Sequence, residues 1–265
     1  MEKEQREKTR IQILISAVNQ NTVTLAAQMN LETDALIVNQ CHENSYSEYV
    51  YKKYRIRCYD SDARGVGLSR NTAMLYADSE LILFGDEDIR YRAGFAQDIA
   101  DEFDRHPEAD MILFNIRQSE GRETYHNHAF GRVRWYNYGR YPAYSICVRT
   151  RKLREANVMF SLLFGGGAQY SNGEDSLFLH ECLQKGLHIF RSPVEIGYEI
   201  ARKSTWFEGY TEKFFTDRGV LYHFLYGRMA YLLGLRFLLR HRNTMCRKMS
   251  FGKCYALMKK GIQSV

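Results

Sequence analysis

Short apolar runs alternate with amphipathic stretches along the first half of the chain. The run 11–18 is apolar and rich in Ile, which is typical of a strand buried on both faces. Residues 22–31 have a helical pattern, and the runs 35–38 and 54–59 are strand-like. The chain therefore begins by alternating strands with helices.

The alternation continues to about residue 116. Apolar residues at helical spacing in 67–77 precede the strand-like run 81–84, and the helical stretch 94–106 precedes the run 111–116. Repeated strand–helix units predict an α/β fold with a mostly parallel, open sheet and helices on both faces. Such sheets bind ligands at the carboxyl ends of their strands. The residues that follow each strand are therefore the first candidates for a site.

The pattern changes after residue 120. Residues 121–144 are aromatic and polar without a helical period, whereas 144–149 predicts one more strand, antiparallel to the others. Residues 173–185 are helical again, and long helical patterns fill the chain from about residue 210. We expect one α/β domain over 1–215 and a helical extension over 216–265.

The composition is that of a globular protein with one large core. The chain has 265 residues, of which 45% are hydrophobic, and only 3 are Pro, which argues against long disordered linkers. The six Cys have neither CxxC nor metal-finger spacing, so we interpret them as reduced structural thiols. Met1 to Arg10 has mixed charge, and no apolar segment of signal-peptide type follows it, so we expect a cytoplasmic protein.

Three consecutive carboxylates follow the apolar run 81–84. They are Asp86, Glu87 and Asp88, at the strand end where α/β sheets place ligands. Like charges this close recruit a cation, and Mg²⁺ or Mn²⁺ prefers oxygen ligands that it shares with a diphosphate. Asp86 and Asp88 point the same way in an extended stretch. The alternative is a solvated acidic turn, which the buried strand before it makes less favourable.

A second acidic pair, Glu174 and Asp175, follows Gly173 at the start of the helical stretch. Acidic residues in a first helical turn are stabilised by the helix dipole and by capping, so stability alone accounts for the pair equally well. A general base would need one carboxylate directed at an acceptor hydroxyl in a cleft. The sequence leaves both interpretations open.

The glycine-rich segment 165–167 lies just before this pair. It lacks the Lys-Ser/Thr of a P-loop and the spacing of a dinucleotide fingerprint. A flexible loop over the site, with Tyr170 as a platform for a sugar, and an ordinary turn are both compatible with it.

In this order, the segment Gly67-Leu68-Ser69-Arg70-Asn71, the segment 84–88 and the segment 173–175 resemble family 2 of the inverting glycosyltransferases, which have the GT-A fold. The resemblance covers about residues 11–215. It implies that Asp86 and Asp88 bind a divalent metal, Mn²⁺ or Mg²⁺, together with the diphosphate of a sugar nucleotide. It implies further that Asp175 is the catalytic base.

The resemblance also assigns substrate contacts. It places Arg70 and Asn71 against the nucleotide and Glu174 in the acceptor site, while Arg202, Lys203 and Trp206 stand where the family closes the donor site. Together with the strand-end amides, the expected substrate-binding residues are Asn19, Asn39, Arg70, Asn71, Asp86, Glu87, Tyr170, Glu174, Arg202 and Trp206. The sequence departs from the family's pattern at two strand ends, which bears on the identity of the nucleotide base. The loop after the first strand, which contains Asn19, lacks the family's Pro, and the second strand ends in Asn39-Gln40-Cys41 where the family has an Asp-rich turn. An amide can still bind uracil, so we expect a UDP-sugar donor.

The net charge of +6 is concentrated at the end of the chain. Residues 226–265 hold nine Lys or Arg and no Asp or Glu, so the first 225 residues have 28 basic and 31 acidic residues. The stretch 222–240 is rich in Leu and aromatic residues, but Arg228 and Arg236 make it a poor transmembrane span. A peripheral segment on an anionic membrane surface fits this pattern. Packing against the main domain or a second subunit fits equally well.

A location at the membrane surface would suit a saccharide or lipid-linked acceptor, which the family that this sequence resembles commonly uses. A nucleotidyltransferase is the main alternative enzyme, but its Gly-rich, Arg-containing signature is missing near 11–18. A non-catalytic binding module is the other alternative, and Asp86, Asp88 and Asp175 argue against it. No nucleic-acid reader motif accompanies the basic residues, so we expect no nucleic-acid partner. A homo-oligomer stays open.

Overall fold

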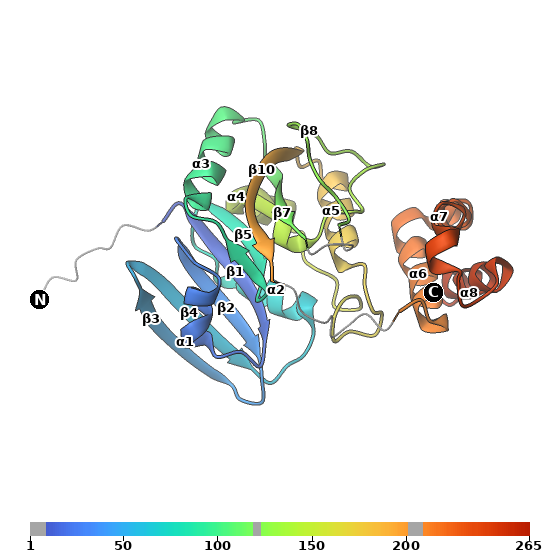
Figure 1. The fold of residues 1–265 in the computed structure, drawn as a ribbon, viewed down its shortest axis with the longest axis horizontal. Helices are drawn as coiled ribbons and strands as arrows, with labels where there is room; N and C mark the ends of the chain where they lie inside the picture. Colours follow the sequence, from blue (N-terminus) through green and yellow to red (C-terminus); the bar gives the residue numbers. More distant parts are fainter. Residues whose placement is uncertain (1–8, 119–122, 201–208) are drawn as a thin grey trace, which may run out of the picture.

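A mixed β-sheet runs through the centre of the protein (Figure 1). The computed structural model describes residues 9–118, 123–200 and 209–265. The strands follow the order β3-β4-β2-β1-β5-β9-β7-β10-β6, and β8 pairs with β10. The strands are β1 (Ile11–Val18), β2 (Asp34–Gln40), β3 (Ser45–Tyr51), β4 (Tyr54–Ser61), β5 (Leu81–Asp86), β6 (Ile89–Tyr91), β7 (Met111–Arg117), β8 (Gly131–Arg132), β9 (Ile146–Arg149) and β10 (Ile189–Glu199).

Helices cover both faces of the sheet, as the sequence predicts. The helices are α1 (Thr22–Gln28), α2 (Val66–Tyr76), α3 (Phe95–Arg105), α4 (Thr150–Ala156), α5 (Glu174–Gln184), α6 (Glu212–Tyr226), α7 (Ala230–Met245) and α8 (Phe251–Gln263), with short 3-10 turns η1 (Ala143–Ser145) and η2 (Gly227–Met229). Successive side chains of β1 enter opposite cores: Leu14 joins residues of α2 and α5, whereas Ile13 and Ile15 join residues of α1 and α3. The α/β fold class is confirmed.

The strands β4, β2, β1 and β5 are parallel neighbours. Each is followed by a loop at the same edge of the sheet, so the loops after Val18, Gln40, Ser61 and Asp86 lie next to one another. This edge is where an open α/β sheet binds ligands.

The sheet is mixed rather than mostly parallel, because β3 is antiparallel to β4 and antiparallel pairs return beyond β5. β9 lies between β5 and β7 and is antiparallel to both, which confirms the antiparallel strand expected over 144–149. Two longer strands, β3 and β10, could not be predicted from the hydrophobic pattern. β3 is an edge strand with mostly exposed side chains, and β10 contains Pro193 and two register shifts against β7. Neither has the apolar periodicity by which strands are recognised, because an edge strand faces water and a Pro breaks the run.

The helices α6, α7 and α8 gather at one end of the molecule (Figure 1). Phe215, Leu238 and Met258 form their common core. α6 also contributes Val220 and Leu221 to the core of the α/β part. It begins at Glu212, before the expected boundary at residue 216, so this helix belongs to both units. No helix in the described ranges is long and apolar enough to cross a membrane.

Glycines let α6 and α8 approach each other closely. A Cβ at Gly261 would lie 2.0 Å from the carbonyl oxygen of Thr216, and one at Gly219 would lie 2.1 Å from that of Met258. Distances below 3 Å leave no room for a methyl group without moving backbone atoms. The packing of the two helices therefore depends on the absence of side chains at these positions.

We expect Gly261→Ala to destabilise the protein by about 1–3 kcal/mol in spite of the better helix propensity of Ala, because the helices must separate. Thermal denaturation measures the effect. Gly252→Ala is the matched control in the same helix, since a Cβ there meets nothing within 4 Å. Equal melting temperatures of the two variants would show that the close approach is unimportant.

Candidate active site

The acidic cluster lies at the carboxyl end of β5, where Asp86 pairs in register with Ser16 of β1. Gly85 before it is tightly enclosed, because a Cβ there would lie 2.8 Å from the Tyr91 hydroxyl and 3.1 Å from Ile13. The strand is therefore packed up to the first carboxylate. The Asp86 side chain is 28% exposed and opens to solvent beyond the sheet. Its position agrees with the predicted ligand edge.

Arg70 of α2 joins the two acidic motifs. Its side chain is only 4% exposed, and its Nη2 donates to Asp86 Oδ1 at 3.0 Å. Its Nη1 donates to Asp175 Oδ1 at 2.9 Å and to Glu174 Oε1 at 3.3 Å. The guanidinium lies 5.2 Å from the centre of the Phe160 ring. One buried cation thus holds carboxylates from β5 and from the start of α5 in a single site.

Asp175 lies in an environment that favours its protonated form. Burial raises the pKa of its carboxyl, and the neighbouring charge of Glu174 raises it further, while Arg70 acts in the opposite direction. Burial alone would lower the pKa of Arg70, but Asp86, Asp175 and Glu174 more than offset it, so that this pKa is raised. A carboxyl whose pKa is moved toward neutrality suits a general base.

The remaining residue of the acidic cluster connects β5 to β1. Glu87 Oε2 accepts a hydrogen bond from the backbone N–H of Val18 at 2.5 Å. Asn19, the next residue, has a positive φ of 51°. The main-chain oxygen of Asp88 accepts from Ile200 N at 2.7 Å, which ties the cluster to the end of β10. Glu87 therefore contacts the end of β1, directly before the expected residue Asn19, at the ligand edge.

Asn39 and Asp60 form a polar pair at the ends of β2 and β4. Asn39 Nδ2 donates to Asp60 Oδ1 at 2.8 Å, and the two residues are partners in the parallel register. The sequence analysis did not select Asp60 as a site residue. Its position directly after the strand-like run 54–59 could have indicated it, because a polar residue there lies at the same sheet edge as Asn39.

Asn71 and Tyr170 make structural contacts within the described chain. The Asn71 amide pairs with both backbone groups of Phe160, at 2.9 and 2.8 Å, and so fixes the ring beneath Arg70. Tyr170 stands 4.9 Å from Phe164, measured between ring centres. The predicted donor-site residues Arg202 and Trp206, with Lys203, lie outside the described residues.

The glycine-rich segment 165–167 lies against Glu174, because a Cβ at Gly165 would come within 2.8 Å of its carboxyl carbon. Helix α6 secures the residues that follow. Asp217 is 5% exposed, and its Oδ2 accepts from Ser171 N at 2.9 Å and from Lys213 Nζ at 2.6 Å. This contact could not be predicted from the sequence, since a Lys and an Asp four residues apart on a helix usually form a surface ion pair.

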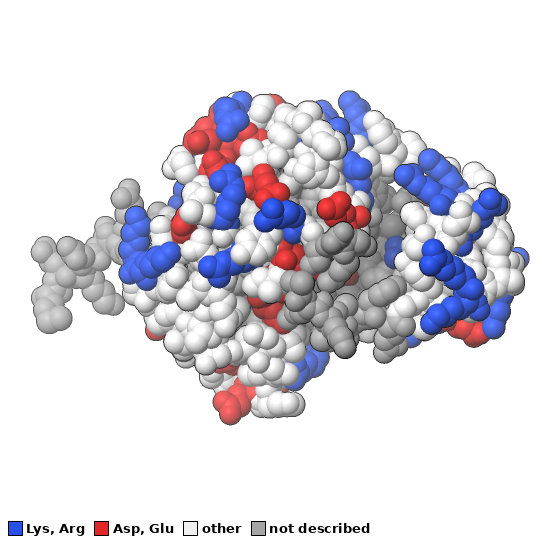
Figure 2. Space-filling model, in the orientation of Figure 1, with Lys and Arg blue, Asp and Glu red and all other residues white. Residues whose placement is uncertain are grey.

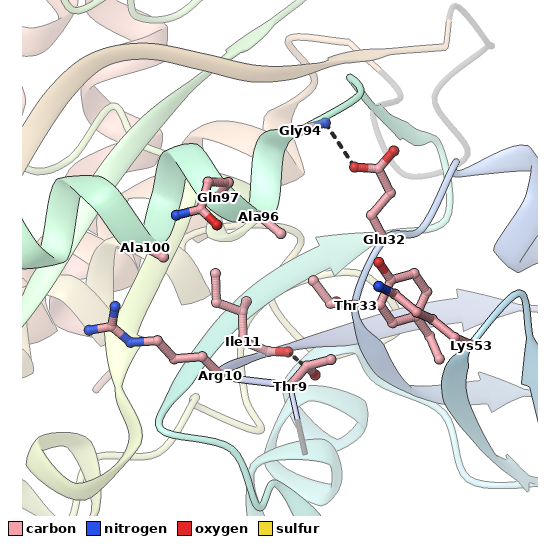
Figure 3. A pocket seen from close by; sticks show the side chains of 11 residues that line it. Thr9, Arg10, Ile11, Glu32, Thr33, Lys53, Gly94, Ala96, Gln97 and Ala100 are labelled. Atoms are coloured by element: carbon pink, nitrogen blue, oxygen red, sulfur yellow. Dashed lines mark hydrogen bonds between the residues drawn. The ribbon is translucent and has the colours of Figure 1, made fainter. Parts of the chain in front are cut away.

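Two cavities lie in different parts of the described structure. The larger, about 700 Å³, lies at the amino ends of the strands and is lined by Arg10, Glu32 and Lys53 among others (Figure 3). Its Arg10 is engaged by Glu80 and Asp104. A cavity of about 320 Å³ lies between the glycine-rich loop and the start of α6. The smaller cavity is the one beside Glu174.

The acidic residues fit a metal that a diphosphate also binds. No group of three His, Cys, Asp or Glu side chains capable of holding an ion occurs in the described part of the chain. Mg²⁺ in nucleotide enzymes takes one or two carboxylates and completes its shell with phosphate oxygens and water. Asp86 ends β5, whereas Asp88 lies in the turn before β6, so the extended stretch expected to align the two side chains is absent. Both carboxylates could still contribute to such a shell, because hard cations prefer oxygen ligands.

Comparison with known proteins identifies the architecture. The family model described as "Glycosyl transferase family 2" matches residues 13–160. The structure of S. aureus TarS 1-349 in complex with UDP-GlcNAc is similar, with a TM-score of 0.62 and 16% identity over 90% of this chain and 74% of that one. The same protein in complex with UDP gives a TM-score of 0.59, at 16% identity over 90% of this chain and 73% of that one. No curated protein matches at the sequence level.

We expect Arg70→Met to lower the free energy of unfolding by about 3–5 kcal/mol at neutral pH, because three carboxylates lose their buried counter-charge. The pKa of Asp175, which burial and Glu174 already raise, rises further in the variant because Arg70 no longer opposes the shift, so protonation favours the folded state. The deficit should therefore shrink as the pH is lowered.

Urea denaturation at several pH values measures this deficit. Arg55→Met is the control, since its pair with Glu48 is 39% and 38% exposed and is worth less than about 1 kcal/mol. A deficit for Arg70→Met no larger than that of the control would contradict the central role of Arg70.

Proposed function

The chain belongs to glycosyl transferase family 2, and from this premise we propose that it transfers a sugar from a UDP-sugar to a hydroxyl of a saccharide or lipid-linked acceptor, with inversion. One observation carries the proposal. Arg70 joins Asp86, the candidate donor side, to Glu174 and Asp175, the candidate acceptor side. A direct displacement requires the donor and the base to be close together, and Arg70 holds these two sides of the site next to each other.

Asp175 is the proposed general base. It removes the proton from the acceptor hydroxyl while that oxygen attacks the anomeric carbon on the face opposite the diphosphate. The bond from this carbon to the diphosphate oxygen breaks, and UDP leaves with the electron pair, so the configuration inverts. The raised pKa of Asp175 supports this role, because a base works best with a pKa near the operating pH.

Asp86 and Asp88 are the proposed ligands of Mn²⁺ or Mg²⁺. The bound ion would neutralise charge that develops on the departing diphosphate. The exposure of Asp86 supports this assignment, since its carboxylate is accessible from the ligand edge although it contacts Arg70. Arg70 keeps the carboxylates in place before any ligand arrives.

The nucleotide is proposed to lie along the ends of β1, β2 and β4. Asn19, Glu87 and the pair formed by Asn39 and Asp60 supply polar groups there. UDP is our choice of nucleotide, because the similar TarS structures contain UDP-GlcNAc or UDP. The uracil contact expected of Asn39 is not supported, because its amide is buried and bonded to Gln20 and Asp60. Tyr170, Arg202 and Trp206 stay predicted contacts of the sugar or the diphosphate.

We further propose a cytoplasmic enzyme that is peripheral at the inner face of the cell membrane. Residues 1–215 would form the catalytic domain and 216–265 the extension, with α6 crossing that boundary. The basic extension supports the membrane location, because it has nine cationic residues and no acidic ones. A homo-oligomer stays a prediction.

We expect Asp175→Asn to reduce sugar transfer by about 10²–10⁴-fold, because the amide cannot accept the proton. UDP affinity should stay close to that of the native protein, since the proposed donor contacts remain. Transfer assays with radiolabelled UDP-sugars measure the first quantity, and calorimetric titration with UDP measures the second. Native transfer rates in the variant would exclude Asp175 as the base.

We expect UDP with Mn²⁺ to raise the melting temperature more than other nucleoside diphosphates do, because a ligand that binds only the folded state stabilises it. Asp88→Ala should lose the Mn²⁺-dependent part of this shift. Thermal-shift measurements with each diphosphate, with and without Mn²⁺, provide the test. Stabilisation by no diphosphate would support a non-catalytic binding module instead.

A further inference from the structure

Helix α7 leaves apolar side chains uncovered on its outer side. Its inner side packs on α6 and α8 through the buried residues Gly234 and Leu238. On the outer side, Leu232 is 64% exposed, Leu239 is 52% exposed, and Met229 just before the helix is 54% exposed. Spacings of three and seven residues put these side chains on one side of a helix. They form a ridge that no described part of the chain covers.

Cations are interspersed with this ridge. Arg236 and Arg240 are exposed and fall on the same side of the helix as Leu232 and Leu239. We call Met229, Leu232, Arg236, Leu239 and Arg240 together the α7 face. Figure 2 shows Lys and Arg side chains spread over this end of the molecule.

The cations of the α7 face form no ion pair with an acidic side chain among residues 9–118, 123–200 and 209–265. Residues 226–265 contain no Asp or Glu, and the ion pair of this segment with α6 joins Lys253 to Glu212. No ion pair connects Arg236 or Arg240 to the described residues. A partner that covers this face would have to supply negative charge as well as an apolar environment.

An anionic membrane surface supplies both. Leu side chains enter the boundary between headgroups and acyl chains, and Arg side chains extend toward phosphates. A second copy bound by two-fold symmetry would bring Arg236 and Arg240 against the same cations without a carboxylate between them. The 16 residues of α7 do not qualify as a spanning helix, so the helix would lie along the surface.

We propose that the α7 face binds the surface of an anionic lipid membrane. The inference deepens the proposed function, on whose peripheral location it rests, by naming the surface that makes the contact. α6, which packs on α7, also binds the loop before Glu174 through Asp217. The helices at the membrane thus contact the candidate acceptor side of the site, which suits an acceptor anchored in the same lipid surface.

Co-sedimentation of the full chain with vesicles tests the proposal. The vesicles are phosphatidylcholine alone or phosphatidylcholine mixed with phosphatidylserine. We expect binding to the mixed vesicles, weakening with added salt, and little binding to phosphatidylcholine alone. Absence of binding to the mixed vesicles would overturn the proposal.

Variants locate the contact. The double variant Leu232→Glu, Leu239→Glu should lose binding by at least about tenfold, and Arg236→Gln with Arg240→Gln should weaken binding to the mixed vesicles and reduce its salt dependence. Leu75→Glu is the matched control, because Leu75 of α2 is 70% exposed and lies outside the α7 face. Native binding by the Leu232, Leu239 double variant would overturn the proposal.

Two further measurements separate this inference from its alternatives. Light scattering detects a second copy bound to the α7 face. If the native chain forms a dimer that the Leu232, Leu239 variant does not form, and does not bind vesicles, the partner of the face is a second copy and the membrane proposal is wrong. The variant should keep the UDP-dependent thermal shift and transfer to a soluble acceptor. Vesicle binding without any nucleotide effect would overturn the proposed function and leave the α7 face standing.

Discussion

The arrangement of the site depends on one buried guanidinium. Arg70 lies on α2, yet it contacts carboxylates from the end of β5 and from the first turn of α5. Without this positive charge, Asp86, Glu174 and Asp175 would repel one another at a strand edge that is partly shielded from water. This repulsion would favour displacement of the start of α5 from the end of β5. Phe160 beneath the guanidinium and Asn71, which fixes Phe160, complete the support.

The sheet brings these groups to one place. Parallel strands β4, β2, β1 and β5 end at a common edge, so polar residues from distant parts of the sequence become neighbours there. Close packing around Gly85 fixes the position of the β5 backbone directly before Asp86. On the other side, α6 holds the loop before Glu174 through Asp217 and carries α7 and α8 with it. The C-terminal helices are therefore connected to the candidate acceptor side through direct contacts of α6.

The predicted elements were those whose side chains are buried in a regular pattern. The strands β1, β2 and β5 are nearly continuous apolar runs because both faces are covered, and the amphipathic helix α3 buries one side. α2 is the exception, because it buries Ser69, Arg70 and Asn71 and exposes Leu75 and Tyr76, which belong to the apolar spacing of 67–77. β3 and β10 were missed, since an exposed edge and a Pro-containing strand carry no such pattern. Asp60 and Asp217 were missed because their importance lies in contacts with residues 21 and 46 positions away.

The sequence by itself determined the α/β class, the acidic cluster at the end of β5, the acidic pair at the start of α5 and the charge of the C-terminal helices. All of these follow from local composition and periodicity. Only the tertiary structure decided that Arg70 lies between the two acidic motifs, and that α7 turns apolar and cationic side chains outward together. The physical reason is that electrostatic compensation and exposure depend on distances across the fold, which linear spacing does not contain.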